Sequence, residues 1–500
     1  MPISVSSPPS KRLLALLCAA VLVLSTAPLY VIAFDNHPYY DDFTFSADAH
    51  RAWVQTGSLQ AVLSTAIASA RTVRNTWQGT YTGTLLSNVQ PGVFSESYYW
   101  IGTFVILTAL IACFLFFFSV VFHEVAGLSR ADTASLSCLL LTLMIQLMPD
   151  VGEAFFWFNG GIGNTFIYAL LALSLALAVR LLRAHSKARA VRCAFALVPL
   201  MVLLGGGSYS GGLIGLCLLG LMWLWALRQG NRRGWLLTLL WALWLGCFVY
   251  SMTAPGNAVR SSAIGYQGSA GKAILQSLYY GVAQLGGFFT LPVAAVSLLF
   301  APVLYDAARS SRFHFSHPWL VSMGMICLFC TQLTPPLYSG VFIGGERTVD
   351  TYWISFVAMW FVLLYYLLGA AARRMKPPMA LYAKARRGVA LASVCLLLVG
   401  CLGYKQPDDT LYGAQNLAGP SAALSLLTGE AARYDREMTA REALLNDAAK
   451  PEITLAPLTA VPGVLMDDLL KPGATYDVRP ALCNYYGKTA IAIQGEGALR

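Results

Sequence analysis

The chain has 500 residues, of which 57% are hydrophobic and 12% are charged, and its mean hydropathy is +0.60. A soluble domain carries about 25% charged residues, so this composition excludes a soluble protein and predicts an all-α polytopic membrane protein. The net charge of +10 does not indicate nucleic-acid binding, because the basic residues form short clusters between apolar runs, as they do in cytoplasmic loops.

Apolar runs predict about eleven transmembrane helices, at residues 13–33, 99–122, 133–149, 164–180, 193–207, 212–227, 235–252, 281–304, 318–334, 351–371 and 389–404. The first run is too long for a cleaved signal peptide, so we expect a retained anchor. Only the glycine-rich residues 205–212 separate the fifth and sixth spans. Whether these are two helices or one decides on which side every later loop lies.

Charge supports this count. With the N-terminus in the cytoplasm, the segments assigned to the inner side carry 19 Lys and Arg residues against three acidic residues. This excess is what the positive-inside rule requires. An odd number of spans then places the C-terminus outside. The sequence therefore predicts a transmembrane domain at 1–404 and a small extracytoplasmic cap at 405–500.

The first predicted outer loop, residues 34–98, begins with an aromatic and acidic stretch that contains Asp41 and Asp42. These carboxylates follow directly on the first span, so we expect them at the membrane–water boundary, where tyrosine and tryptophan also gather. There they can meet a substrate that is part lipid and part polar. The alternative is that both acids only cap the next helix, since carboxylates favour helix N-termini.

Residues 58–78 of the same loop have the pattern of an amphipathic helix. Its apolar stripe consists of Leu59, Leu63, Ala66, Ile67, Ala70 and Trp77. We expect this helix to lie flat on the membrane, with Arg71 and Arg74 directed towards lipid headgroups.

Further polar residues fall in other loops on the predicted outer face: Glu153, Asn257, Arg260, Glu346 and Arg347. Asp41 or Asp42 can act as a general base, because partial desolvation makes a carboxylate more basic. Arg260 and Arg347 can bind a phosphate with their planar guanidinium groups. Aromatic faces for a sugar are available on Trp77, Tyr81, Trp157 and Tyr209, and Lys488 is a further candidate phosphate ligand.

Each of these residues also has a structural interpretation. Residues 255–257 form a Pro-Gly-Asn sequence that is typical of a type II turn. Arg347 can pair with Glu346 or Asp350, and Glu153 can cap a short helix. The functional interpretation depends on all of them meeting on one face.

The order of several short motifs resembles that of an uncharacterised bacterial membrane-protein family. These are Tyr40-Asp41-Asp42-Phe43, Trp77-Gln78-Gly79-Thr80-Tyr81, Glu153 to Asn159-Gly160, Ala254-Pro255-Gly256-Asn257 to Arg260, Glu346-Arg347 and Tyr485-Tyr486-Gly487-Lys488. That family looks like the GT-C glycosyltransferases, which use sugars on polyprenyl phosphate carriers at the outer face of the bacterial cytoplasmic membrane. The resemblance implies a GT-C-like fold that includes helix 58–78, and a catalytic base at Asp41 or Asp42.

The sequence is therefore interpreted as a multi-pass glycosyltransferase of the bacterial inner membrane. Its expected partners are a polyprenyl-phosphate-linked sugar donor, membrane lipids, and a cell-envelope glycan, lipid or protein as acceptor. No spacing specifies a metal site, although two adjacent carboxylates leave a divalent metal open. The first alternative is a lipid or polysaccharide transporter or flippase, and the second is a scaffold protein without chemistry. Apart from Arg180 at the membrane edge, the apolar runs contain no charged residue that could serve a coupled carrier.

Overall fold

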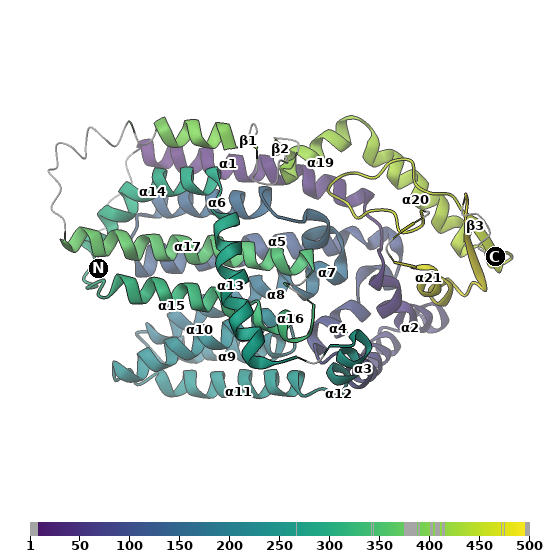
Figure 1. Ribbon diagram of the computed structural model, residues 1–500, viewed down its shortest axis with the longest axis horizontal. Helices are drawn as coiled ribbons and strands as arrows, with labels where there is room; N and C mark the ends of the chain where they lie inside the picture. The colour runs from purple at the N-terminus through teal and green to yellow at the C-terminus, as the bar shows by residue number, and fades with distance from the viewer. Residues whose placement is uncertain are drawn as a thin grey trace.

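The computed structural model describes residues 9–495, apart from residues 267, 342, 344, 375–387, 389–390, 401–403, 406–410, 413–415, 472 and 475. The described chain is predominantly helical, and eight of its helical segments are long and apolar enough to cross a membrane. Most of the long helices run side by side in one bundle (Figure 1). This arrangement fits a multi-pass membrane protein.

The eight segments are built on α1 (Pro9–Ile32), α5 (Trp100–Phe118), α8 (Thr165–Leu182), α9 (Lys187–Gly205), α10 (Tyr209–Arg228), α11 (Gly234–Met252), α14 (Leu291–Ser310) and α17 (Glu346–Arg374). Two shorter helices, α6 (Arg130–Gln146) and α15 (Pro318–Thr331), lie along the same direction (Figure 1). Because these two are shorter than a typical span, the count of eleven stays a prediction.

The separation of the fifth and sixth spans is confirmed, because α9 ends at Gly205 and α10 begins at Tyr209. The single span predicted at 281–304 is wrong. Helix α13 (Ala270–Phe288) ends there and α14 starts at Leu291, and α13 runs across the bundle (Figure 1). Pro292 explains the break, because proline has no N–H to donate within a helix and favours its first turn.

Part of the predicted inner-side sequence lies outside the described residues. This holds for the basic residues Lys376, Lys384, Arg386 and Arg387, and for both ends of the span predicted at 389–404. Within that span, Leu391–Gly400 forms a short apolar helix.

The segment after α1 folds into three helices, α2 (Asp41–Thr56), α3 (Leu59–Thr76) and α4 (Tyr81–Asn88), followed by short turns η2 (Pro91–Val93) and η3 (Glu96–Tyr98). The amphipathic helix predicted at 58–78 is confirmed as α3, with Ser58 as its N-cap. Leu59 and Leu63 are 61% and 54% exposed, so the apolar edge of α3 faces outward. The guanidinium of Arg74 lies 4.0 Å from the Tyr250 ring centroid, and its orientation towards lipid headgroups stays a prediction.

The C-terminal region, residues 404–495, contains α19 (Ala418–Leu427), α20 (Glu430–Asn446) and α21 (Arg479–Tyr486). Strands β3 (Glu452–Leu455) and β4 (Ala490–Ile493) pair in parallel, and β1 (Tyr404–Lys405) pairs antiparallel with β2 (Leu411–Tyr412). The notable break in this region lies between α19 and α20. Gly429, with φ of 75°, separates α19 from α20, because glycine adopts the left-handed conformation without strain.

The C-terminal region packs against both α1 and α2. Its small core of leucine, isoleucine and tyrosine side chains also contains Phe43 and Ala47 of α2. Helix α19 packs on α1, where the Gln146 side chain donates to the Ser25 carbonyl and accepts from the Gly419 N–H. The start of α2, which carries the acid pair, is therefore held from two sides.

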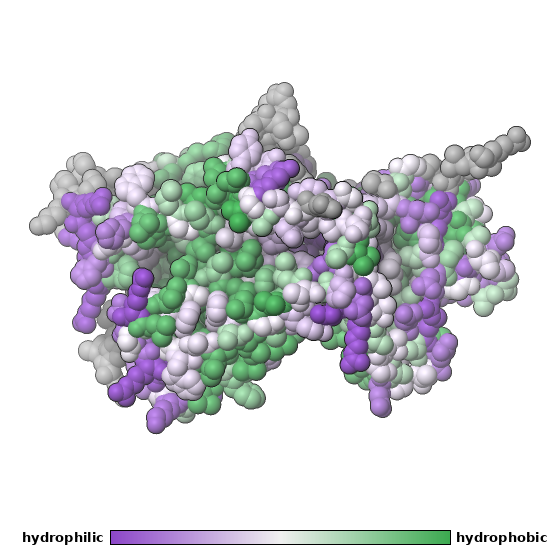
Figure 2. Space-filling model, turned by 60° about the horizontal axis from the view of Figure 1, so that its bottom comes forward, coloured by the Kyte–Doolittle hydropathy of each residue, from purple (hydrophilic) through white to green (hydrophobic). Residues whose placement is uncertain are grey.

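Polarity divides the molecule along the bundle axis. Figure 2 shows hydrophobic residues over the sides of the bundle, and hydrophilic residues gathered at its left end and over the C-terminal region at the right. At the left end, close to the N-terminus, Lys11 pairs with Asp132 and Arg180 pairs with Glu124. The start of α2 lies at the opposite end (Figure 1).

Candidate functional site

The two adjacent acids have different surroundings. Asp42 is fully buried: its Oδ1 accepts from the backbone N–H of Asn159 at 3.0 Å, and its Oδ2 accepts from the N–H of Tyr39 at 3.0 Å and from the hydroxyl of Tyr99. Burial raises the pKa of Asp42 to about 7, and these hydrogen bonds limit the rise. With both oxygens engaged, Asp42 positions the chain and has little capacity left for a substrate.

Asp41 is the accessible member of the pair. It is half-buried, and its Oδ2 accepts from Asn159 Nδ2 at 3.3 Å. Burial raises the pKa of the Asp41 carboxyl, and the positive charges of Arg347 and Arg260 offset part of this rise. Among the two acids, Asp41 is therefore the better candidate for a base. The sequence had left this choice open.

The backbone between the two acids and the preceding span is strained. Tyr40, directly before α2, has φ of 43° and ψ of −106°, although it is not a glycine. Such conformations are unfavourable for residues with a side chain, and they persist where surrounding contacts enforce them. Here the enforcing contacts are those of Asp42 and Tyr39, so the position of Asp41 is set by the packing beneath it.

Arg347, whose charge acts on Asp41, is held by Glu153 and Trp157. It lies in the first turn of α17, where its backbone N–H donates to Glu153 Oε2 at 2.5 Å and its Nη1 lies 3.8 Å from Glu153 Oε1. Its guanidinium also lies 4.8 Å from the ring centroid of Trp157, which is 2% exposed. Among the described residues Arg347 thus pairs with Glu153, and the sequence-based pairing with Glu346 or Asp350 is wrong.

Glu346 and Asp350 instead gather with a further acid, Asp150. The Asp150 backbone N–H donates to Asp350 Oδ1 at 2.8 Å, and the side chains of Glu346 and Asp150 share a hydrogen bond. Glu346 therefore belongs to an acidic group beside the Arg347–Glu153 pair. Its position does not direct it towards a phosphate.

Arg260, the second arginine whose charge acts on Asp41, lies on α12 (Pro255–Ile264). Its Nη1 donates to Gln78 Oε1 at 3.0 Å, and its guanidinium lies 5.4 Å from the Trp77 ring centroid. Its Nε is buried without a hydrogen-bond partner among the described residues, and Arg260 forms no ion pair there. Burial lowers the pKa of Arg260, the charge of Arg347 lowers it further, and Asp41 opposes this.

Asn257 and Tyr209 hold the segment that carries Trp77 and Gln78. The Tyr209 hydroxyl accepts from the Gly79 N–H at 3.0 Å and donates to Asn257 Oδ1 at 2.8 Å. The turn predicted at 255–257 is wrong, because α12 begins at Pro255. A Cβ on Gly256 would lie 2.5 Å from the backbone nitrogen of Trp77, so this glycine permits close helix packing.

The remaining predicted residues divide between surface and scaffold. Trp77 is 43% exposed and leaves a face open for stacking. The Tyr81 hydroxyl instead donates to the Val202 carbonyl at 2.6 Å, and its ring packs on Gly206. Lys488 Nζ donates to the carbonyls of Asp447 at 2.5 Å and Lys450 at 2.8 Å, so it closes the C-terminal end of α20.

Three side chains contribute here to which the sequence analysis assigned no chemical role. Asn159 contacts both acids, Tyr99 bonds to Asp42, and Gln78 bonds to Arg260. Asn159 precedes two glycines, and a Cβ on Gly160 would clash with the Trp157 ring at 2.7 Å. Asn159 and Gln78 already belonged to the short motifs, whereas Tyr99 falls at the start of an apolar run and had no such signal.

The structure therefore brings Asp41, Arg260, Arg347 and Trp77 to one end of the helical bundle. This defines a class: a polytopic helical membrane protein with a carboxylate, guanidinium and aromatic group at a bundle end. Compared with protein-family models, curated proteins and solved structures, the chain matches none.

Proposed function

We propose that this protein is a GT-C-type glycosyltransferase of the bacterial inner membrane. It moves a sugar from a polyprenyl-phosphate carrier to a cell-envelope glycan, lipid or protein acceptor at the outer face. One observation carries this proposal: Asp41, a half-buried carboxylate at the end of the bundle opposite the N-terminus, is close enough to Arg260 and Arg347 for both charges to lower its pKa. That grouping supplies both a base and an anion site.

In the proposed reaction Asp41 takes the proton of an acceptor hydroxyl. The acceptor oxygen then forms a bond to the anomeric carbon while the bond from that carbon to the phosphate oxygen breaks. The electron pair of the broken bond leaves with the lipid phosphate, and the configuration inverts. Burial raises the pKa of Asp41, which makes its carboxylate a stronger base than an exposed aspartate.

The two arginines contribute differently. Arg347 is already paired with Glu153. Arg260, among the residues that the structure describes, instead donates to the neutral side chain of Gln78. Arg260 therefore keeps its charge available for the departing phosphate, and Arg347 mainly sets the field around Asp41. The exposed face of Trp77 offers a stacking surface for the sugar.

The test measures transfer of radiolabelled sugar from a polyprenyl phosphate donor in membranes that contain equal amounts of protein. Asp41→Asn should abolish transfer, whereas Asp48→Asn, the same change at an exposed position of the same helix, should not. Transport of the lipid carrier without sugar transfer in the wild-type protein would contradict the proposal and identify a flippase.

A further inference from the structure

A second group of polar side chains lies where the C-terminal region meets the segment before α2. One ring nitrogen of His37 and one carboxylate oxygen each of Glu96 and Glu442 lie within 4.8 Å of one another. His37 precedes α2, Glu96 begins η3, and Glu442 belongs to α20. Donors bound at about 2.0–2.2 Å to one metal ion lie up to about 4.4 Å apart, so small side-chain rotations would complete such a site.

Two atoms of this group are buried without a hydrogen-bond partner among the described residues. They are His37 Nδ1 and Glu96 Oε1, on side chains that are 8% and 9% exposed. A polar atom that is removed from water without a partner destabilises the fold. A ligand that bonds to both atoms would remove this penalty.

The hydrogen bond of His37 to Asp435 leaves the other ring nitrogen, Nδ1, for a ligand. His37 Nε2 lies 3.0 Å from Asp435 Oδ1, and a carboxylate oxygen accepts hydrogen bonds. In the neutral imidazole, Nε2 therefore carries the proton and Nδ1 has the lone pair. A carboxylate that bonds to the far nitrogen is the usual outer partner of a metal-binding histidine, because it fixes the ring and increases the basicity of the ligand.

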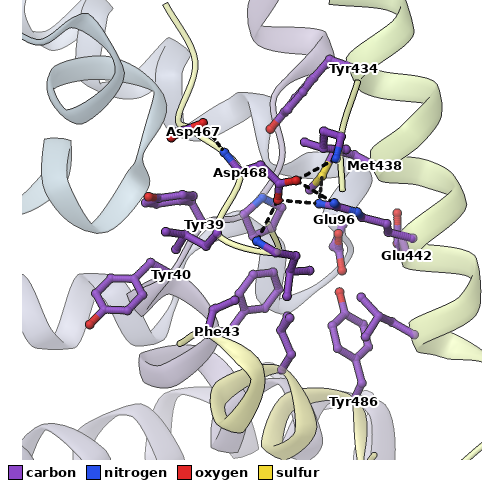
Figure 3. Close-up of a pocket in the computed structure, with 18 residues that line it drawn as sticks. Tyr39, Tyr40, Phe43, Glu96, Tyr434, Met438, Glu442, Asp467, Asp468 and Tyr486 are labelled. Atoms are coloured by element: carbon purple, nitrogen blue, oxygen red, sulfur yellow. Dashed lines mark hydrogen bonds and ion pairs between the residues drawn. The ribbon is translucent and has the colours of Figure 1, made fainter. Parts of the chain in front are cut away.

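No guanidinium among the described residues compensates the two glutamates. Arg441 lines a cavity together with Glu96 and Glu442. Its Nη1 and Nη2, however, bind Asp468 Oδ1 and Oδ2 at 2.9 and 2.8 Å. Figure 3 shows Asp468 near Glu96 and Glu442, together with Tyr486, around this cavity. The cavity, about 60 Å³, borders the Glu96 and Glu442 side of the group, whereas His37 is not among the residues that line it.

We propose that His37, Glu96 and Glu442 bind one divalent transition-metal ion. A set of one imidazole and two carboxylates suits Mn²⁺, Fe²⁺ or Zn²⁺, whereas Mg²⁺ and Ca²⁺ favour oxygen ligands alone. The ion links α20 to the residues that lead into Asp41, so it clamps the C-terminal region onto the candidate active site. This site is separate from the proposed transfer chemistry, and its test does not use that reaction.

Binding is measured with the purified full-length protein in detergent, after removal of metals with EDTA. Mn²⁺ is the probe, because it binds weakly to the protein's thiols and its free form gives a six-line electron paramagnetic resonance signal. We expect one Mn²⁺ per wild-type chain. Glu442→Gln and Glu96→Gln should each weaken the affinity at least tenfold, and Zn²⁺ should displace the bound Mn²⁺.

The matched control is Glu452→Gln, the same change at an exposed position of β3, which should bind Mn²⁺ like the wild type. Mn²⁺ should also raise the thermal midpoint of the wild type and of Glu452→Gln, and leave that of Glu442→Gln unchanged. If Glu96→Gln does not fold, the half-exposed Glu442 decides. The proposal is wrong if the wild type binds no Mn²⁺, or if Glu442→Gln binds it equally well.

Discussion

Two groups of buried carboxylates lie near the start of α2, and they differ in what compensates their charge. Asp41 is close to Arg260 and Arg347, whereas Glu96 and Glu442 have His37 as their near basic neighbour. An arginine keeps its charge at every physiological pH, but a neutral imidazole offers only a lone pair. The first group is therefore suited to an anionic ligand that comes and goes, and the second to a cation that stays.

Asp42 lies next to Asp41, but the groups that donate hydrogen bonds to its carboxylate are all neutral. Burial raises its pKa to about 7 from 3.8. The folded protein then holds a proton that the unfolded chain releases, so this contribution to stability is complete below about pH 4 and is lost as the pH rises through about 7. Three pKa units correspond to roughly 4 kcal/mol.

We therefore expect the thermal midpoint of the wild type to fall between pH 5 and pH 8. Asp42→Asn should flatten this dependence at a lower overall stability, because an amide nitrogen would face the N–H of Tyr39 or Asn159. Thermal unfolding in detergent at a series of pH values gives the measurement. A wild-type midpoint that does not change with pH would mean that Asp42 is ionised in the folded protein.

The next largest effect distinguishes the accessible acid from the buried one. Asp41→Asn should reduce sugar transfer at least about a hundredfold, the range expected for a general base, and leave the thermal midpoint nearly unchanged. The amide keeps the contact with Asn159 and loses the proton acceptor. Transfer rates in membranes with equal protein check this, and near-wild-type transfer would remove Asp41 from the chemistry.

Arg260 tests whether the first group binds an anion. Arg260→Ala should reduce transfer at low donor concentration about tenfold or more, and Arg260→Lys should fall between, because lysine keeps the charge but not the planar fork. The measurement is transfer against donor concentration at fixed acceptor. Arg74→Ala is the control, since that arginine binds Tyr250 instead. Equal loss in both variants would point to general disruption.

The smallest expected effect comes from replacing one carboxylate of the second group by a cation. Glu442→Arg would place beside Glu96 the kind of cation that Asp41 already has. We expect metal binding to disappear and the metal-free protein to gain about 0.5–1 kcal/mol, as for a partly exposed ion pair. Thermal unfolding in EDTA, compared with Glu442→Gln, measures this gain. A less stable Glu442→Arg protein would show that Glu96 is already neutral or otherwise compensated.

Sequence patterns predicted the helical class well, because hydrophobic runs and charge clusters act locally. The helix at 58–78 and the separation of α9 from α10 were confirmed. The predictions failed where a short sequence pattern is compatible with two different local structures. Residues 255–257 suit a turn or a helix start, and residues 281–304 are apolar throughout, although Pro292 begins a new helix within them.

The sequence by itself determined that the chain is a helical membrane protein and that acids, arginines and aromatics occur in its loops. Only the tertiary structure decided their roles. Successive residues of a helix point about 100° apart, so packing alone made Asp42 buried and Asp41 accessible. Likewise His37, Glu96 and Glu442 have no spacing signal in common, because three distant segments meet only when the C-terminal region folds back onto α2.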